Sequence, residues 1–408
     1  MKYAVLTLLM ALLLAGCGEK PLQTQTDPPA SAQSPVIQTD LPSADNRFSL
    51  VGGFSLVETD DYFCGNLMAD SFLRYFDKDS GISGILCADP SCTHDSPACG
   101  AYAKPGSLLA IRDGKRYAIA EDPDKPGADF YLWESDLSGN NRKRRKQISF
   151  ENVVLPYQPQ QYALHQGRLY FLGQAGVVLD GKSGYRVSLL STSVDGSDDF
   201  LVLYDESVTT GIQATVRYGK DAIYLSVVTF EDTGLFHVKI LKLDPGAVAP
   251  ETIYAESDMA ETPGNIWVTD DGTVYLPAAN DDHSVVWDVT DGTKKEIFVR
   301  ENAHAVIPEL SENLILMMGN TENGRQAEVL DLDGNSLYRG ALFPEPIPGL
   351  SGDPNSAGLG FLGGDSEKLV FSLMQMTDSD FWDAVVLLDL QNNLAPTVLW
   401  SSIDSSEG

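Results

Sequence analysis

The densest group of side chains able to do chemistry lies between residues 87 and 99. Three cysteines and one histidine, Cys87, Cys92, His94 and Cys99, occur there in the spacing C-x₄-C-x-H-x₄-C. Thiolate and imidazole groups are good ligands for Zn²⁺, and a Cys₃His set is a known structural tetrahedron. The spacing is not that of a standard zinc finger or knuckle, so possible zinc binding is one of three interpretations of this stretch.

The second interpretation is a disulfide that closes the same loop, between Cys92 and Cys99 or between Cys87 and Cys99. The third is a set of free thiols that respond to redox conditions. Cys64 follows Phe63 in an expected strand, and we expect it to be a small buried apolar residue. The sequence leaves the choice between metal, disulfide and free thiol open.

A catalytic centre has no comparable signal in the chain. The sequence contains no G-x-S-x-G, no H-E-x-x-H and no glycine-rich phosphate loop. The stretch Asp331–Asn335 resembles the start of a calcium-binding EF-hand loop but has Ser336 and Leu342 where that loop needs glycine and glutamate. Asp281, Asp282 and His283 indicate an exposed hairpin turn. We therefore predict no catalytic residues, and the sequence favours a protein that is not an enzyme.

Five consecutive positive charges interrupt an otherwise acidic chain. They are Arg142, Lys143, Arg144, Arg145 and Lys146, just after a Ser-Gly-Asn-Asn turn. Such a run could contact an anionic wall polymer or phospholipid headgroups. It could equally be an edge strand whose charges prevent pairing with another chain, and the sequence favours this second interpretation.

The elements that must position these residues form an internal repeat. Each copy opens with a turn pair such as Asp113-Gly114 or Asp271-Gly272 and runs into an apolar or aromatic strand. The strands share one column of bulky residues, 40 to 55 positions apart: Phe63, Tyr117, Tyr170, Tyr224, Tyr275, Ile315 and Val370. An apolar segment precedes each turn pair, and two further strands follow it. Four strands per copy are typical of hairpin-linked β-blades.

Seven such copies predict an all-β, seven-bladed β-propeller over residues 47–408. A single blade cannot bury both faces of its sheet, whereas blades stacked around an axis can. Six or eight blades remain possible, and a pair of β-sandwiches is the alternative fold. The repeat resembles the TolB-like propellers of exported bacterial lipoproteins, and the 87–99 stretch resembles a Cys-rich loop found in propeller-bearing lipoproteins of Gram-positive gut anaerobes.

The N-terminus indicates export. Lys2 is followed by an uncharged apolar run, Ala4 to Gly16, too short to span a membrane. The stretch Leu14-Ala15-Gly16-Cys17 resembles the lipobox of bacterial lipoproteins, which implies that residues 1–16 are a signal peptide and that Cys17 is lipidated. Residues 17–46 are rich in Pro, Gln, Thr and Ser, and we expect them to be a flexible linker.

Composition narrows the class of partner. A formal net charge of -30 argues against binding of DNA or RNA, whose phosphates would be repelled. We therefore predict a monomeric lipoprotein, anchored to the extracytoplasmic side of the cell membrane, that binds or scaffolds a protein or glycan ligand at a propeller face. The alternatives are an envelope enzyme that acts on glycans with carboxylates in the propeller channel, and a metal- or redox-responsive module built on the 87–99 stretch.

Overall fold

The computed structural model describes residues 55–67, 71–103, 108–112, 114–122, 124, 130–148, 161–166, 168–193, 200–231, 233–244, 246–301, 306–322, 324–350, 353–376 and 381–402. The expected signal peptide, Cys17 and the linker lie outside these residues. Within them, no helix is long and apolar enough to cross a membrane.

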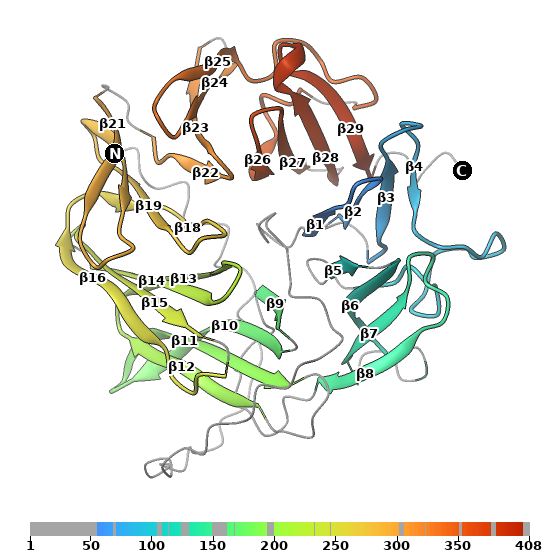
Figure 1. Ribbon diagram of the computed structural model, residues 1–408, viewed down its shortest axis with the longest axis horizontal. Helices are drawn as coiled ribbons and strands as arrows, with labels where there is room; N and C mark the ends of the chain where they lie inside the picture. Colours follow the sequence, from blue (N-terminus) through green and yellow to red (C-terminus); the bar gives the residue numbers. More distant parts are fainter. Residues whose placement is uncertain are drawn as a thin grey trace. The chain divides into compact units, whose positions relative to one another are not determined.

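Seven antiparallel sheets are arranged around a central axis (Figure 1). Six of them have four strands each, and the sheet that starts at β17 has five, because β17 and β18 both pair with β19. In every sheet the strands follow one another in chain order, with the first strand nearest the axis (Figure 1). The predicted seven-bladed propeller is confirmed.

The strand bounds follow the repeat. Blades 1 to 3 consist of β1 (Ser55–Glu58), β2 (Tyr62–Asn66), β3 (Arg74–Asp77) and β4 (Ser83–Ile85); β5 (Leu108–Arg112), β6 (Lys115–Glu121), β7 (Phe130–Asp136) and β8 (Lys143–Ile148); and β9 (Gln161–His165), β10 (Arg168–Leu179), β11 (Lys182–Ser193) and β12 (Leu201–Val208). Blades 4 and 5 consist of β13 (Gly211–Tyr218), β14 (Ile223–Phe230), β15 (Phe236–Leu243) and β16 (Glu251–Met259); and β17 (Thr262–Pro263), β18 (Trp267–Val268), β19 (Val274–Ala279), β20 (His283–Asp288) and β21 (Lys295–Glu301). Blades 6 and 7 consist of β22 (Glu309–Ser311), β23 (Leu314–Thr321), β24 (Gly324–Asp331) and β25 (Ser336–Ala341); and β26 (Gly358–Gly364), β27 (Lys368–Met376), β28 (Phe381–Asp389) and β29 (Ala395–Ser401), with a short 3₁₀ helix, η1 (Leu390–Asn392), before β29.

The column of bulky residues identifies the second strand of each blade. Its members lie on β2, β6, β10, β14, β19, β23 and β27. This strand is paired on both edges within its sheet, and the adjacent blades pack on its two faces. Burial on both faces explains why aromatic and branched residues recur there.

Apolar packing between adjacent blades forms the core. Seven clusters of buried side chains occur among the described residues, and each joins one blade to the next around the ring. The cluster between blades 7 and 1 includes Trp400 from β29 and Phe63 from β2. The ring is therefore closed by side chains, because no strand is shared between the first and last blades.

An ion pair supports this closure. The Glu58 carboxylate on β1 accepts hydrogen bonds from Lys78 Nζ of blade 1 at 2.7 Å and from Lys368 Nζ of blade 7 at 2.9 Å. These groups are partly exposed, so we expect the ion pairs of Glu58 to contribute little to the free energy of unfolding compared with the apolar contacts.

Candidate functional site

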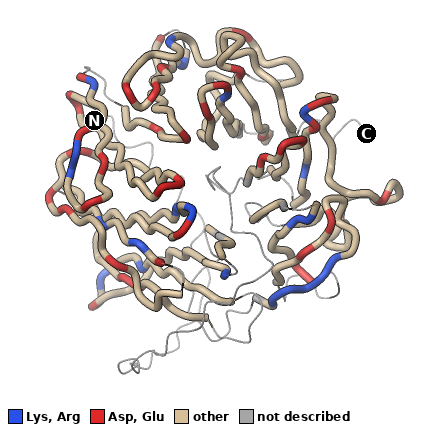
Figure 2. Tube along the Cα trace, in the orientation of Figure 1, with Lys and Arg blue, Asp and Glu red and all other residues tan. Residues whose placement is uncertain are grey.

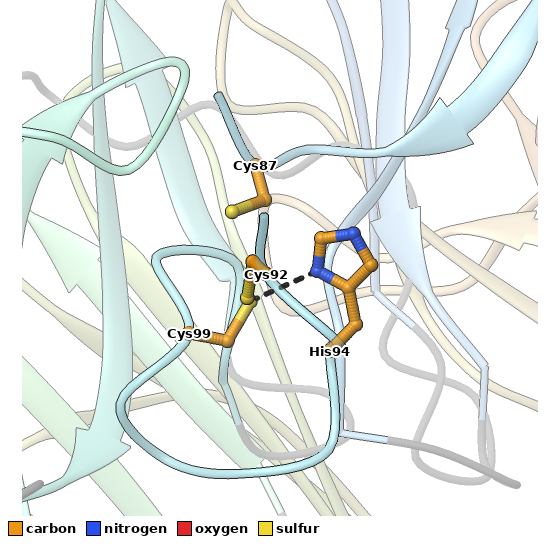
Figure 3. A group of neighbouring side chains, drawn as sticks. All are labelled: Cys87, Cys92, His94 and Cys99. Atoms are coloured by element: carbon orange, nitrogen blue, oxygen red, sulfur yellow. Dashed lines mark hydrogen bonds between the residues drawn. The ribbon is translucent and has the colours of Figure 1, made fainter. Parts of the chain in front are cut away.

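The structure gathers Cys87, Cys92, His94 and Cys99 in the connection between β4 of blade 1 and β5 of blade 2. We call residues 87–99 the Cys/His loop. The four potential ligand atoms all lie within 4.8 Å of one another (Figure 3). The Nδ1 atom of His94 is 3.4 Å from the Sγ atom of Cys99. Cys99 is buried, and the other three residues are half-buried.

Tight turns inside the loop bring the four side chains together. The Cys92 N–H donates to the Asp89 carbonyl at 3.1 Å, and the Cys99 N–H donates to the Ser96 carbonyl at 3.0 Å. His94 has a φ of 53°, in the left-handed region that residues with a Cβ rarely adopt. Its ring lies edge-on to Phe72, with the ring centroids 6.4 Å apart. Such a backbone conformation recurs where a side chain is held for a ligand.

Backbone N–H groups point at two of the sulfur atoms. Burial alone would raise the pKa of Cys87, but hydrogen bonds, the largest from the Asp89 N–H, hold it below its usual value. Burial raises the pKa of Cys99 to about 12, against the opposing effect of the Ala101 N–H, which lies 3.3 Å from Sγ. In both cases the donor comes two residues after the cysteine. Donors in this position favour a thiolate.

Arg116 on β6 holds both ends of the loop. Its side chain is 3% exposed. Its guanidinium donates to the carbonyl of Leu86 at 3.2 Å, just before the loop, and to the carbonyl of Gly100, just after it. The Nε atom donates to Ser135 Oγ of β7 at 2.9 Å. Burial, together with the nearby charge of Arg142, lowers the pKa of Arg116 to about 10.

Arg142 forms a second contact from blade 2. Its guanidinium carbon lies 4.3 Å from the centroid of the Trp133 ring. Its Nη1 atom is 3.4 Å from the carbonyl oxygens of Pro97 and of Cys99. Together with Arg116, Trp133 and Tyr102, Arg142 lines a small pocket beside the loop. Blade 2 thus presents one buried cation, Arg116, and one half-buried cation, Arg142, to the Cys/His loop.

The loop also packs against the turn that joins β7 to β8. Gly139 in that turn has a φ of +84°, and a Cβ there would lie 2.5 Å from the carbonyl oxygen of Gly100. The Ala88 N–H donates to the Ser138 carbonyl at 3.1 Å. A side chain at position 139 would therefore push the loop away from blade 2.

We expect Gly139→Ala to destabilise the protein more than a positive φ alone explains. The control is Gly181→Ala, because Gly181 has a similar φ of +77° but no atom within 4 Å of the added Cβ. The control should lower the free energy of unfolding by about 1 to 2 kcal/mol. Gly139→Ala should cost about 1 to 3 kcal/mol more, since it also causes a clash. Denaturant unfolding measures both, and equal losses would contradict the packing of the loop against this turn.

Cys64 does not belong to the cluster. It lies on β2, is 1% exposed, and packs with Leu73 and Ala103 between blades 1 and 2. Burial raises its pKa to about 12. The expectation of a small buried apolar residue is confirmed. All four described cysteines are free thiols in the structure.

The basic run is the edge strand of blade 2. Residues 143–148 form β8, which pairs only with β7 and appears as a continuous positive segment (Figure 2). Its charges are largely engaged within the blade. Arg144 donates to Asp122 at 2.6 Å, and Arg145 pairs with Glu134. Burial would raise the pKa of Glu134, but Lys115 and Arg145 hold it below its usual value. Arg142 contacts the Cys/His loop, and Lys143 is exposed with no side-chain partner in the part of the chain that the structure describes.

The innermost strands carry few ionisable groups. Among their described residues the carboxylates are Glu58 of blade 1, which pairs with two lysines, and Glu309 of blade 6. Burial raises the pKa of Glu309, and the charge of Arg217 opposes this rise. Glycan hydrolysis uses two carboxylates about 5 to 9.5 Å apart. Glu58 and Glu309 lie on blades 1 and 6, and each has cationic neighbours.

The remaining histidines are dispersed. His165 is buried on β9, and His237 Nε2 lies 3.4 Å from Glu231 on blade 4. His283 begins β20 beside a turn of Asp281 and Asp282, as expected, and its Nε2 atom is 3.6 Å from Glu261. His304 lies outside the described residues. Asp331 and Asn335 form a turn in which the Asn335 N–H donates to the Asp331 carboxylate at 2.7 Å.

Comparison with known proteins shows the fold and no family. No family model matches the chain, and no curated protein matches it in sequence. A prolyl endopeptidase structure matches with a TM-score of 0.50 and 12% identity, over 85% of this chain and 49% of that one. Polysaccharide lyase Uly1 matches with a TM-score of 0.43 and 9% identity, over 82% and 89%. TolB from Acinetobacter baumannii matches with a TM-score of 0.30 and 11% identity, over 71% and 80%. The chain spans about half the length of the prolyl endopeptidase, and at these identities the likeness concerns the fold alone.

Proposed function

We propose that the protein is an extracytoplasmic lipoprotein, anchored to the membrane through Cys17, that binds a protein partner with one face of its propeller. The observation that carries the binding role is the distribution of exposed apolar side chains. Of the ten large hydrophobic residues exposed among the described ones, five lie on the hairpins that join second to third strands. They are Val178, Tyr185, Phe230, Met376 and Phe381.

These five residues share one side of the ring. The first strand is innermost in every blade, so the second strands all run in the same direction along the axis, and the hairpins that follow them lie on the same side. We call this side the hairpin face. The other five exposed hydrophobic residues lie in or beside fourth strands, at the outer rim of the blades. The five residues of the hairpin face lie on blades 3, 4 and 7, so we infer a partner that covers this side of the ring and contacts several blades at once.

The chemistry of the hairpin face favours a protein over a glycan. Its two most exposed side chains, Val178 at 76% and Met376 at 71%, are aliphatic. These two side chains gain free energy by burial against another apolar surface and offer a sugar no hydrogen bonds. The aromatic members of the face, Tyr185, Phe230 and Phe381, are less exposed, at 40 to 45%. Charged residues such as Lys182 and Glu231 flank them, which provides the polar rim common at protein interfaces.

The anchor is tested by the fate of Cys17. Wild-type protein should fractionate with membranes and incorporate labelled fatty acid, whereas Cys17→Ser should do neither, because the thiol is the expected acylation site. Release of wild-type protein without acyl label would contradict the anchor.

The partner is tested by capture from native envelopes with the immobilised protein. Val178→Ser combined with Met376→Ser should lose the captured partner. The matched control combines Val299→Ser with Leu337→Ser, which are 47% and 43% exposed on outer strands, and this control should retain the partner. Equal capture by both double variants would rule out the hairpin face as the binding surface.

A further inference from the structure

We propose that Cys87, Cys92, His94 and Cys99 bind one structural zinc ion, and that this ion fastens the connection between blade 1 and blade 2. The inference is independent of the proposed partner and of the anchor, because it concerns only the Cys/His loop and the residues of blade 2 around it.

The four ligand atoms are already close to the arrangement that zinc requires. Metal–sulfur bonds of about 2.3 Å and metal–nitrogen bonds of about 2.0 Å put the ligands of a tetrahedron about 3.6 to 3.8 Å apart. All four atoms lie within 4.8 Å of one another, and His94 Nδ1 is 3.4 Å from Cys99 Sγ. Rotation of side chains, without rearrangement of the blades, would close the remaining gap. A set of four protein ligands leaves no open position, so the site is structural rather than catalytic.

The charges around the loop distinguish zinc from a disulfide. Arg116 and Arg142 face the loop, and Arg116 makes its hydrogen bonds to carbonyl and hydroxyl oxygens rather than to a carboxylate. Three thiolates and one Zn²⁺ carry one net negative charge, which the buried Arg116 and the half-buried Arg142 would stabilise. A disulfide with one remaining thiol is neutral and would add no negative charge beside Arg116 and Arg142, whose charges Asp136 and Asp122 oppose only in part. The same cations, with N–H donors at Cys87 and Cys99, act as the outer shell that orients and stabilises thiolate ligands.

The location of the site explains what the ion would do. The Cys/His loop follows β4, a strand of three residues, and contains no regular element. Hydrogen bonds from Arg116 and Ala88 attach it to blade 2, while Leu86 remains bonded to Leu73 of blade 1. A zinc ion bound by residues 87, 92, 94 and 99 would hold this connection in one conformation, although the connection is short and has no regular secondary structure.

The test uses the full chain purified without chelators, in detergent. We expect one zinc per chain by mass spectrometry. After denaturation with zinc removed, Cys64, Cys87, Cys92 and Cys99 should all titrate as thiols, as peptide mapping of the labelled cysteines would show independently of Cys17. Cobalt substitution should give the absorption of tetrahedral thiolate-bound Co²⁺. Chelation should lower the melting temperature by on the order of 5 °C, and added Zn²⁺ should restore it. This reversal needs no variant and so does not depend on a variant that folds.

Substitutions then assign the ligands. Cys92→Ser and His94→Ala should each abolish stoichiometric zinc, whereas Cys64→Ala, outside the cluster, should keep it. Two fewer titratable thiols with no zinc would establish a disulfide instead. Free thiols that bind neither Zn²⁺ nor Co²⁺ would also overturn the proposal, as would zinc retained by both ligand variants.

Discussion

Replacement of Arg116 by methionine should lower the zinc affinity of the Cys/His loop about 10- to 100-fold, the usual loss when an outer-shell partner of a metal site is removed. Methionine preserves much of the volume but supplies neither the positive charge nor the hydrogen bonds to Leu86 and Gly100. The free energy of unfolding of the zinc-free protein should also fall by about 3 kcal/mol, because buried oxygens lose their donors. Competition with a chromophoric chelator measures the first effect, and denaturant unfolding measures the second.

Two further variants separate charge from geometry at this position. Arg116→Lys keeps the cation but cannot bridge both ends of the loop, since an ammonium lacks the planar fork of a guanidinium. Zinc affinity should therefore fall between those of the wild type and Arg116→Met. Arg339→Met removes a positive charge from an exposed position and should change neither quantity. If Arg339→Met weakened zinc binding as much as Arg116→Met, net charge rather than the clamp would be the cause.

The blades could be predicted from the sequence because their signals are local. A turn such as Asp271-Gly272 fixes a reversal over a few residues, and Gly272 does adopt a positive φ of +85° in the structure. Alternation in the flanking segments then assigns each strand its buried side. This reasoning does not predict β22, because a strand of three residues is too short to show an alternation of apolar and polar residues.

The surroundings of the Cys/His loop could not be predicted in this way. The spacing of Cys87, Cys92, His94 and Cys99 identified the candidate ligands. Arg116, in contrast, lies on blade 2, whereas the loop follows the last strand of blade 1, and Arg116 is not part of a recognisable motif. Arg142 was recognised as part of a basic run, and its role was hidden because charge patterns do not reveal which side chain is buried. In the structure it stacks on Trp133 and contacts the loop, while its neighbours pair with acids on the same blade. Long-range contacts of this kind depend on how blades pack, which single-residue preferences do not encode.

The hairpin face also depends on how distant parts of the chain are arranged by the fold. Val178 and Met376 are nearly 200 positions apart in the sequence, and each is unremarkable in its own strand. Only the common direction of the second strands puts their hairpins on one side of the ring. The sequence therefore predicted a loop face as the binding surface in general terms, and the fold identifies the side chains that would form it.

Closure of the ring leads to the second large effect. Trp400 is 1% exposed in the cluster that joins blade 7 to blade 1. Trp400→Ala should lower the free energy of unfolding by about 3 to 5 kcal/mol, because the cavity left behind can only partly collapse. Trp400→Phe should cost less than about 1.5 kcal/mol, since the indole N–H has no hydrogen-bond acceptor among the described residues and most of the ring volume is kept.

The position of Trp400 also predicts which strands should lose protection from amide exchange in Trp400→Ala. Blades 2 and 3 are consecutive in the chain, whereas among the described residues blades 7 and 1 share no sheet and meet through side chains. Trp400→Ala should therefore accelerate amide exchange selectively in β1 to β4, as blade 1 detaches from its neighbour before the rest unfolds. The control is Phe171→Ala, which leaves a cavity at an equally buried site between blades 2 and 3. It should not accelerate amide exchange in blade 1 selectively. Identical exchange maps for the two variants would mean that the propeller unfolds as one unit and that its closure is no weaker than its other interfaces.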